Sequence, residues 1–169
     1  DLYMGLFDAF KKKDTTPAPV TDDIVNIGDG TVVDITEVSD PVFAGEMLGK
    51  GVGVQLNNGK VCSPVSGKVT VAFPTGHAYG IQTENGIEVL LHIGIDTVNL
   101  NGEGFKSKVK QGDTVRTGDV LVNVDLDLVK EKGYDSTVMV IITNTPDFKD
   151  VVKTTGSLAK GDVILHVER

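Results

Sequence analysis

From residue 24 onward the chain alternates short apolar runs with turn-forming dipeptides, which is the pattern of a protein built from short strands. Gly, Asn, Asp and Pro clusters separate the runs, with Asn57-Asn58-Gly59 and Asn85-Gly86 as clear turn signals. Two further segments, 126–132 and 146–152, each predict a single helical turn. The runs predict strands at residues 24–27, 31–38, 52–56, 68–73, 77–83, 87–93, 120–124, 138–143 and 163–167.

No long stretch between these runs repeats at the helical period, so crossover helices and a parallel sheet are not expected. The sequence predicts an all-β protein, an antiparallel β-sandwich or flattened barrel with short helical turns. Residues 112–121 resemble residues 156–165, and residues 29–32 resemble 66–69. These echoes suggest an internal duplication of one β-unit, although turn chemistry alone could also produce them.

The chain divides into an N-terminal appendage with a linker, residues 1–23, and a single domain, residues 24–169. Residues 4–13 place apolar side chains on one helical face and end in three lysines, so they could rest weakly on an anionic membrane surface. The alternative is a frayed terminus, because a helix this short is marginal in water. The segment 15–19 is a Pro-containing linker.

The composition excludes several classes of protein. Of the 169 residues, 40% are hydrophobic, which is enough for one core, and the net charge is −8 without the basic stripe of a nucleic-acid-binding protein. Cys62 is the only cysteine, so neither a disulfide framework nor a cysteine-based metal cluster exists within the chain. No apolar stretch approaches the length of a membrane span, and no signal peptide is recognisable. We therefore expect a cytoplasmic protein.

Two histidines are brought together by the hairpin that the sequence predicts. Asn85-Gly86 favours a two-residue type I′ turn, and in that register Tyr79 lies opposite His92. His77 then lies on the same face, diagonal to His92, with Cα atoms roughly 7–8 Å apart. A three-residue turn would shift the register by one and place the two histidines on opposite faces.

Two neutral imidazoles in an apolar hollow suit nucleophilic chemistry. If a backbone carbonyl holds Nδ1–H of His92, its Nε2 presents the lone pair that attack requires. Gly94 allows a close backbone approach beside it, and Thr75 is placed to orient His77, which could donate a hydrogen bond to a charged group in transfer. Taken alone, however, the pair is equally compatible with histidines that have no function.

The alternatives are a metal site and other nucleophiles. Two imidazoles supply half of a tetrahedral zinc site, and Asp96 is near, but the chain lacks a His-x-His or His-Glu-x-x-His motif. His166 is expected to be structural or solvent-facing, and Cys62 a small buried residue. No Walker motif is present, so direct use of ATP is not indicated.

The segments around both histidines resemble a known family. Leu91-His92-Ile93-Gly94-Ile95-Asp96-Thr97-Val98, followed by residues 100–105, closely resembles the motif of glucose-class enzyme IIA of the bacterial sugar phosphotransferase system. Residues 73–81 resemble the second histidine motif of that family, and residues 40–49 and 63–67 match further stretches. The resemblance runs from about Gly30 to the C-terminus.

This resemblance implies an antiparallel β-sandwich that carries phosphoryl groups and requires no cofactor. His92 would take phosphate at Nε2 from the phosphocarrier protein HPr and pass it to a cysteine of the IIB domain of a sugar permease (IICB). His77 would support the transfer without being phosphorylated, Thr75 would orient His77, and Gly94 and Asp96 complete the expected site. The sugar itself is not indicated, because the carrier never touches it.

The resemblance also implies a docking rim and a set of alternatives. The apolar residues Val42, Phe43, Met47 and Leu48 would dock both partners, together with Phe73.

In some family members the two histidines help to hold zinc when a regulatory target supplies another ligand, so His77 and His92 are candidate zinc ligands in a complex. A mainly regulatory binding module that controls transporters or kinases through the same face is the alternative function. Gly76 and Gly80 stand where relatives commonly carry larger residues.

Overall fold

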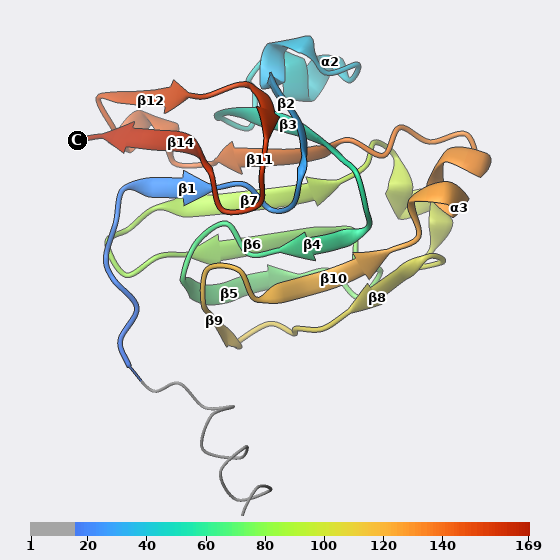
Figure 1. The fold of residues 1–169 in the computed structure, drawn as a ribbon, viewed down its shortest axis with the longest axis horizontal. Helices are drawn as coiled ribbons and strands as arrows, with labels where there is room; N and C mark the ends of the chain where they lie inside the picture. Colours follow the sequence, from blue (N-terminus) through green and yellow to red (C-terminus); the bar gives the residue numbers. More distant parts are fainter. Residues whose placement is uncertain (1–15) are drawn as a thin grey trace, which may run out of the picture.

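The computed structural model describes residues 16–169, and residues 4–13, for which a membrane contact was predicted, lie outside this range. The described part forms short antiparallel strands joined by tight turns, as the alternating pattern predicted (Figure 1). The strands are β1 (Asp23–Val25), β2 (Gly30–Asp34), β3 (Lys50–Leu56), β4 (Lys60–Cys62), β5 (Gly67–Ala72), β6 (Ala78–Gln82), β7 (Glu88–Ile93), β8 (Phe105–Ser107), β9 (Thr114–Val115), β10 (Val120–Val124), β11 (Val138–Ile142), β12 (Asp150–Lys153), β13 (Gly156–Leu158) and β14 (Val163–Glu168). The helices are α2 (Pro41–Ala44) and α3 (Leu126–Glu131), with 3₁₀ turns η1 (Ile35–Glu37), η2 (Thr97–Leu100) and η3 (Thr145–Asp147).

Three antiparallel sheets form two layers. One layer is an eight-stranded sheet with the order β13-β2-β3-β11-β7-β6-β5-β9. The second layer consists of two three-stranded sheets, β1-β14-β12 and β4-β10-β8, which lie across the first in Figure 1. The sheets stay open, so the sandwich that the sequence predicted is confirmed and the flattened barrel is not formed.

The core lies between the layers and contains mainly Val, Ile and Leu. The inward residues of the central strand β7 are Val89, Leu91 and Ile93, which pack in this core with side chains from both small sheets. The alternate residues of the same strand point to the outer face of the large sheet. On that face a second, smaller cluster contains Phe43 of α2 and Met139 of β11, with Leu90 of β7 packed against it. His92 of β7 is therefore on the outer face, beside Phe43 of α2.

The two segments 112–121 and 156–165, which resemble each other in sequence, contain turns with the same hydrogen bond. Asp119 accepts the backbone N–H of Arg116 at 2.8 Å, and Asp162 accepts that of Ala159, also at 2.8 Å. The strand before each of these turns, β9 or β13, forms one of the two opposite edges of the eight-stranded sheet. The strand after each turn, β10 or β14, is the centre of a three-stranded sheet. The two segments that resemble each other thus occupy matching places in the sheets.

The predicted register of the β6–β7 hairpin is wrong by one residue. Ala78, not Tyr79, lies opposite His92. The turn contains three residues, because the N–H of Thr83 donates to the carbonyl of Ile87 at 2.9 Å and, within the turn, Gly86 alone adopts a positive φ, of 86°. A type I′ turn would need positive φ at Asn85 as well. The Asn85 side chain instead accepts a hydrogen bond from the Thr83 hydroxyl at 2.6 Å, which stabilises the longer loop.

The helical predictions have different outcomes. The turn predicted at 126–132 is confirmed as α3, whose N-cap Asp125 accepts the backbone N–H of Leu128. The turn predicted at 146–152 is wrong, because η3 ends at Asp147 and the chain then forms β12 against β14. No helix within residues 16–169 is long and apolar enough to cross a membrane.

Candidate functional site

His92 is held near the end of β7, on the outer face of the eight-stranded sheet. It pairs with Met139 of β11 on one side and with Ala78 of β6 on the other. The ring of Phe43, from α2, lies with its centroid 5.0 Å from that of His92. The imidazole is half-buried, so apolar surroundings hold it while one edge still reaches solvent.

One tautomer of His92 is selected by the backbone. Its Nδ1 lies 2.8 Å from the carbonyl oxygen of Gly94. Because a carbonyl oxygen only accepts hydrogen bonds, Nδ1 carries the proton and Nε2 keeps a free lone pair. This is the arrangement that the sequence analysis required of a nucleophilic imidazole.

Gly94 is necessary for this arrangement because it has a φ of +77° and no space around its Cα. A Cβ atom there would lie 2.4 Å from the Thr97 methyl group and 2.9 Å from the carbonyl oxygen of Asp135. The N–H of Gly94 donates to the carbonyl of Thr137 at 2.9 Å, which fixes the peptide unit from the other side. The close approach expected at Gly94 thus comes from the chain's own backbone.

His77 reaches His92 because it precedes β6 rather than belonging to it. Strict alternation would have placed its side chain with Tyr79 in the inner core, on the opposite face from His92. The turn before the strand, in which the N–H of Gly76 donates to the carbonyl of Phe73 at 2.8 Å, redirects the chain. The two imidazole centroids are 5.3 Å apart at 79°, and the Phe73 ring lies 5.1 Å from His77.

Thr75 contacts His77 as the sequence predicted. Its Oγ1 lies 2.6 Å from Nδ1 of His77, so Nε2 of His77 is directed away from Thr75. His77 is only 3% exposed, and its backbone carbonyl accepts the N–H of Ile93 at 2.7 Å. Both the side chain and the backbone of His77 are therefore fixed next to the strand that carries His92.

Burial lowers the pKa of both histidines. The pKa of His92 is lowered because burial disfavours the charged ring, although the Gly94 carbonyl and the negative charges of Asp40 and Asp96 oppose the change. The pKa of His77 is lowered by burial and, secondarily, by the positive charge that His92 carries when protonated. Both rings are consequently neutral at pH 7.

The lowered pKa values predict that the protein loses stability in weak acid. Since the unfolded histidines titrate near pH 6.5 and the folded ones below it, the unfolded chain binds more protons in that interval. The stabilisation from the neutral rings is complete above pH 6.5 and is lost as pH falls through the folded pKa values. Urea unfolding at pH 7.5 and 5.5 should show this loss, and His77→Gln should reduce it. Equal pH dependence in both proteins would contradict the prediction.

Of the five residues predicted to form the docking rim, Phe43 contacts the ring of His92 and Phe73 that of His77. Val42, Met47, Leu48 and Phe73 are exposed, and Met47 has 75% of its surface free. Phe43 is buried instead, because it packs both on His92 and on the outer-face cluster. Other exposed large apolar side chains among the described residues are Val20, Val71, Val98, Val152 and Val163.

Two carboxylates border the site. Asp40, which the sequence analysis missed, caps α2 by accepting the N–H groups of Val42 and Phe43 at 2.8 and 3.3 Å. Its position before Pro41, at N1 of the helix, is a recognisable N-cap signal. Asp96 is exposed, has a φ of 61° and begins η2 without a side-chain capping bond. Within residues 16–169, no three His, Cys, Asp or Glu side chains are grouped as a metal site.

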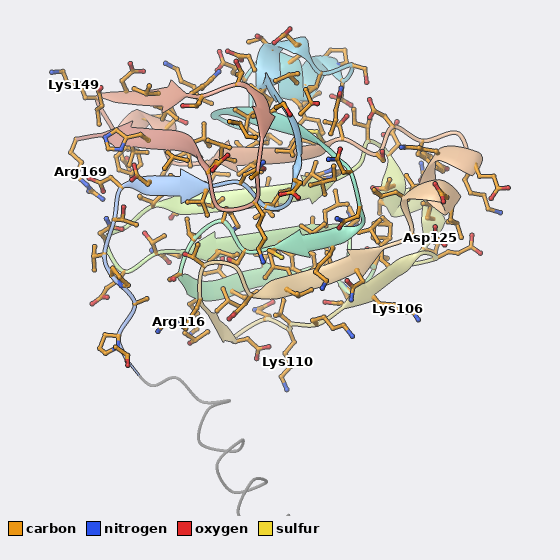
Figure 2. All side chains as sticks on the ribbon, in the orientation of Figure 1. Lys106, Lys110, Arg116, Asp125, Lys149 and Arg169 are labelled. Carbon is orange, nitrogen blue, oxygen red and sulfur yellow. The ribbon has the colours of Figure 1, made fainter. Side chains whose placement is uncertain are left out.

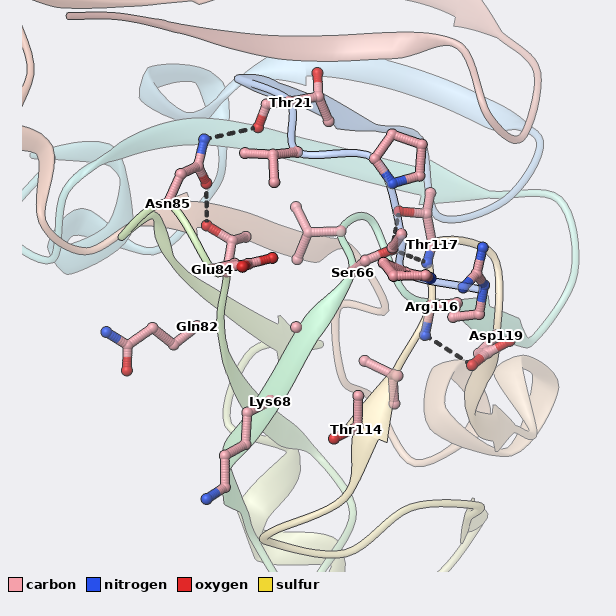
Figure 3. Close-up of a pocket in the computed structure, with 18 of the residues that line it drawn as sticks. Thr21, Ser66, Lys68, Gln82, Glu84, Asn85, Thr114, Arg116, Thr117 and Asp119 are labelled. Carbon is pink, nitrogen blue, oxygen red and sulfur yellow. Dashed lines mark hydrogen bonds between the residues drawn. The ribbon is translucent and has the colours of Figure 1, made fainter. Parts of the chain in front are cut away.

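Other candidate features lie elsewhere. A cavity of about 910 Å³ opens between residues 16–21 and the β6–β7 turn, at the opposite end of these strands from the histidines (Figure 3). It contains neither histidine. His166 is exposed and its Nδ1 lies 2.7 Å from Asp23, while Cys62 is buried, as expected for both.

Several known proteins are similar to this chain. Residues 22–148 match the family model described as "phosphoenolpyruvate-dependent sugar phosphotransferase system, EIIA 1". The chain is 44% identical over 160 residues to the glucose-specific EIIA component of Oceanobacillus iheyensis, covering 94% of this chain and 96% of that protein. It is 45% identical over 150 residues to the glucose-specific EIICBA component of Streptococcus pneumoniae, covering 88% of this chain but only 21% of that longer protein.

A solved structure shows the same fold. Glucose permease IIA from Mycoplasma capricolum superposes with a TM-score of 0.78 at 40% sequence identity, covering 87% of this chain and 96% of that one. The sandwich is thus shared with that protein. The chain belongs to the EIIA 1 family of the phosphoenolpyruvate-dependent sugar phosphotransferase system.

Proposed function

We propose that this protein is a phosphoryl carrier that takes phosphate from phospho-HPr on Nε2 of His92 and passes it to a cysteine of a IIB domain. The observation that carries the proposal is the Nδ1–Gly94 hydrogen bond of 2.8 Å, which leaves Nε2 as the free nucleophilic atom beside His77. A neutral imidazole with a fixed tautomer needs no further activation at pH 7. The EIICBA name of the Streptococcus pneumoniae relative supports a IIB partner.

Each half of the reaction balances at these atoms. The Nε2 lone pair of His92 attacks phosphorus while the bond to the donor breaks and its electron pair stays with the donor. In the second step a cysteine thiolate attacks phosphorus, and the P–N pair returns to Nε2 of His92. If Thr75 donates to Nδ1 of His77, then Nε2–H of His77 can donate to a phosphoryl oxygen during both steps.

The surface around the histidines supports docking of protein partners. Exposed apolar side chains become favourable when a partner covers them, and Val42, Met47, Leu48 and Phe73 are exposed. The negative charges of Asp40 and Asp96 act on His92, so they lie near the same site. This combination fits a partner with an apolar centre and basic residues at its rim. The names of the relatives support glucose as the sugar that the permease finally phosphorylates.

Two further parts of the proposal concern cofactors and location. We propose that the transfer itself requires no cofactor, and that the protein works in the cytoplasm. In a complex, we propose that Nε2 of His77 and Nε2 of His92 supply two of the four ligands of a zinc ion, because Nδ1 of each ring is engaged elsewhere, and that the partner supplies the rest.

Incubation with enzyme I, HPr and phosphoenolpyruvate tests the proposal. We expect one phosphate per chain, labile in acid because a phosphorylated imidazole loses phosphate when the ring is protonated. Intact-protein mass spectrometry gives the stoichiometry, and peptide mapping at neutral pH gives the residue. A wild-type protein that stays unmodified beside a functional HPr would refute the proposed function.

A further inference from the structure

The short segment after α2 carries the most exposed side chain of the proposed docking rim and has an unusual backbone. Glu46 adopts a φ of 57°, a left-handed conformation that is unfavourable for a non-glycine residue. Its N–H donates to the carbonyl of Phe43 at 3.0 Å, and the N–H of Gly49 donates to the carbonyl of Glu46 at 3.2 Å. This turn projects Met47 and Leu48 into solvent.

A lysine from a distant part of the chain holds this turn. Nζ of Lys153, the last residue of β12, lies 3.4 Å from the Glu46 carboxylate and 2.8 Å from that of Asp34. The Lys153 side chain is only 15% exposed, and the two carboxylate side chains are 36% and 32% exposed. By contrast, the side chains of the pair Lys132–Glu103 are both more than half exposed at 3.8 Å. The Lys153 contacts are therefore less screened by water than an ordinary surface pair.

Asp34 gives this lysine a fixed anchor. Its carboxylate also accepts the backbone N–H and the hydroxyl of Thr36, both at 3.0 Å, and its own N–H donates to Glu37 at 3.2 Å as part of the cap of η1. Burial raises the pKa of Asp34, but the hydrogen bonds from Lys153 and Thr36 outweigh this effect and lower it, so the carboxylate stays charged. Oδ1 of Asp34 thus accepts hydrogen bonds both from Thr36 and from the ammonium group of Lys153.

We propose that Lys153 is a positioning residue for partner recognition. Its ammonium group links the Glu46 carboxylate to that of Asp34, the N-cap of η1, and so holds Met47 and Leu48 in the conformation that docks. Lys153 contacts neither histidine among its hydrogen bonds and ion pairs, so its role concerns the encounter with the partner and not the transfer of phosphate. A rim that is already ordered loses less conformational entropy when a partner covers it. This inference rests on the proposed function.

The test uses Glu46→Gln and Lys153→Met in steady-state assays of phosphate uptake from phospho-HPr. Glu46→Gln is the sharper variant, because it weakens one contact and leaves the Asp34–Lys153 pair intact. We expect KM to rise about fivefold in Glu46→Gln and roughly tenfold in Lys153→Met, with kcat within about twofold of wild type. Lys153→Arg, which keeps the charge and can bind both carboxylates, should restore most of the affinity.

Lys110→Met is the matched control. Lys110 is exposed at the edge of the molecule opposite α2, and the change removes the same charge (Figure 2). Its KM should equal that of wild type. If Glu46→Gln and Lys153→Met keep the wild-type KM while wild type takes up phosphate normally, the inference is wrong and the proposed function stands.

A second measurement needs no partner and separates the two proposals. The ε-methyl resonance of Met47, labelled with ¹³C, should shift or change its linewidth in Glu46→Gln and Lys153→Met, but not in Lys110→Met. An unchanged Met47 signal in both variants would overturn the positioning role even if the protein proved not to carry phosphate.

Discussion

His92→Gln should abolish the uptake of phosphate. Glutamine keeps the length and polarity of the side chain but lacks the basic ring nitrogen that attacks phosphorus. We expect the rate to fall by roughly a thousandfold or more, so that no label is detected when the variant is incubated with enzyme I, HPr and phosphoenolpyruvate. Mass spectrometry of the intact chain should show the unmodified mass alone.

His166→Gln provides the matched control, since the chain has three histidines and His166 is exposed and bound to Asp23 at 2.7 Å, away from the proposed site. It should be phosphorylated at the wild-type rate. Label that persists in His92→Gln, or disappears in His166→Gln, would show that His92 is not the acceptor. Thermal unfolding of both variants distinguishes a chemical effect from a loss of folding.

The second large effect is expected for His77→Gln, which should load phosphate but pass it on poorly. His77 lies with its ring centroid 5.3 Å from that of His92 and is held by Thr75 at 2.6 Å. When a cysteine thiolate attacks, its negative charge approaches a phosphoryl group that is already negative, so a hydrogen-bond donor at this position matters most in that step. We expect the rate of transfer to a IIB domain to fall roughly a hundredfold to a thousandfold.

The measurement is a single-turnover assay with phosphorylated protein and purified IIB domain, next to a loading assay with phospho-HPr. Thr75→Val keeps the shape of the side chain but removes its hydrogen bond to His77, and it should slow the same step by a smaller factor. Normal rates in both assays for His77→Gln would remove His77 from the mechanism.

The strands and helices whose residues follow a clear apolar pattern or begin with a cap were predictable from the local sequence. The inward-facing residues of β7 and β11 are apolar in every position, and α3 begins at an Asp cap, so both were predictable. The short strands β4, β8, β9 and β13 were not predicted, because two or three residues carry no periodicity and pair only where a neighbouring strand offers its backbone. Segment 146–152 contains a Pro that favours a turn start, yet pairing with β14 makes its end a strand.

The two histidines are adjacent, as predicted, although the hairpin register from which this was predicted is wrong by one residue. The Asn85-Gly86 dipeptide predicted a two-residue turn, but the side chain of Asn85 binds Thr83 and stabilises a three-residue loop. That register alone would separate the two histidines. They meet because His77 lies before β6, in a turn that no longer follows the alternation of the strand.

The sequence of β7 does not reveal that one face of the strand packs in the main core and the other under α2. Leu91 and His92 are neighbours in an apolar run, and only the covering of the outer face by α2 shows why a polar ring is tolerated there. The contact between Lys153 and Glu46 is equally invisible in the sequence, because 107 positions separate the two residues.

By itself, the sequence determined the all-β class, the pair of histidine motifs and the family that they indicate, because these depend on which residues are neighbours along the chain. The tertiary structure alone decided the hairpin register, the tautomer of His92, the burial of Phe43 and the anchoring of the docking rim. The register and the tautomer depend on short-range hydrogen bonds, Thr83–Asn85 and His92–Gly94, whose geometry is not visible in the residue order. The burial of Phe43 and the contact of Lys153 with Glu46 depend on packing between distant segments, which meet only when the chain folds.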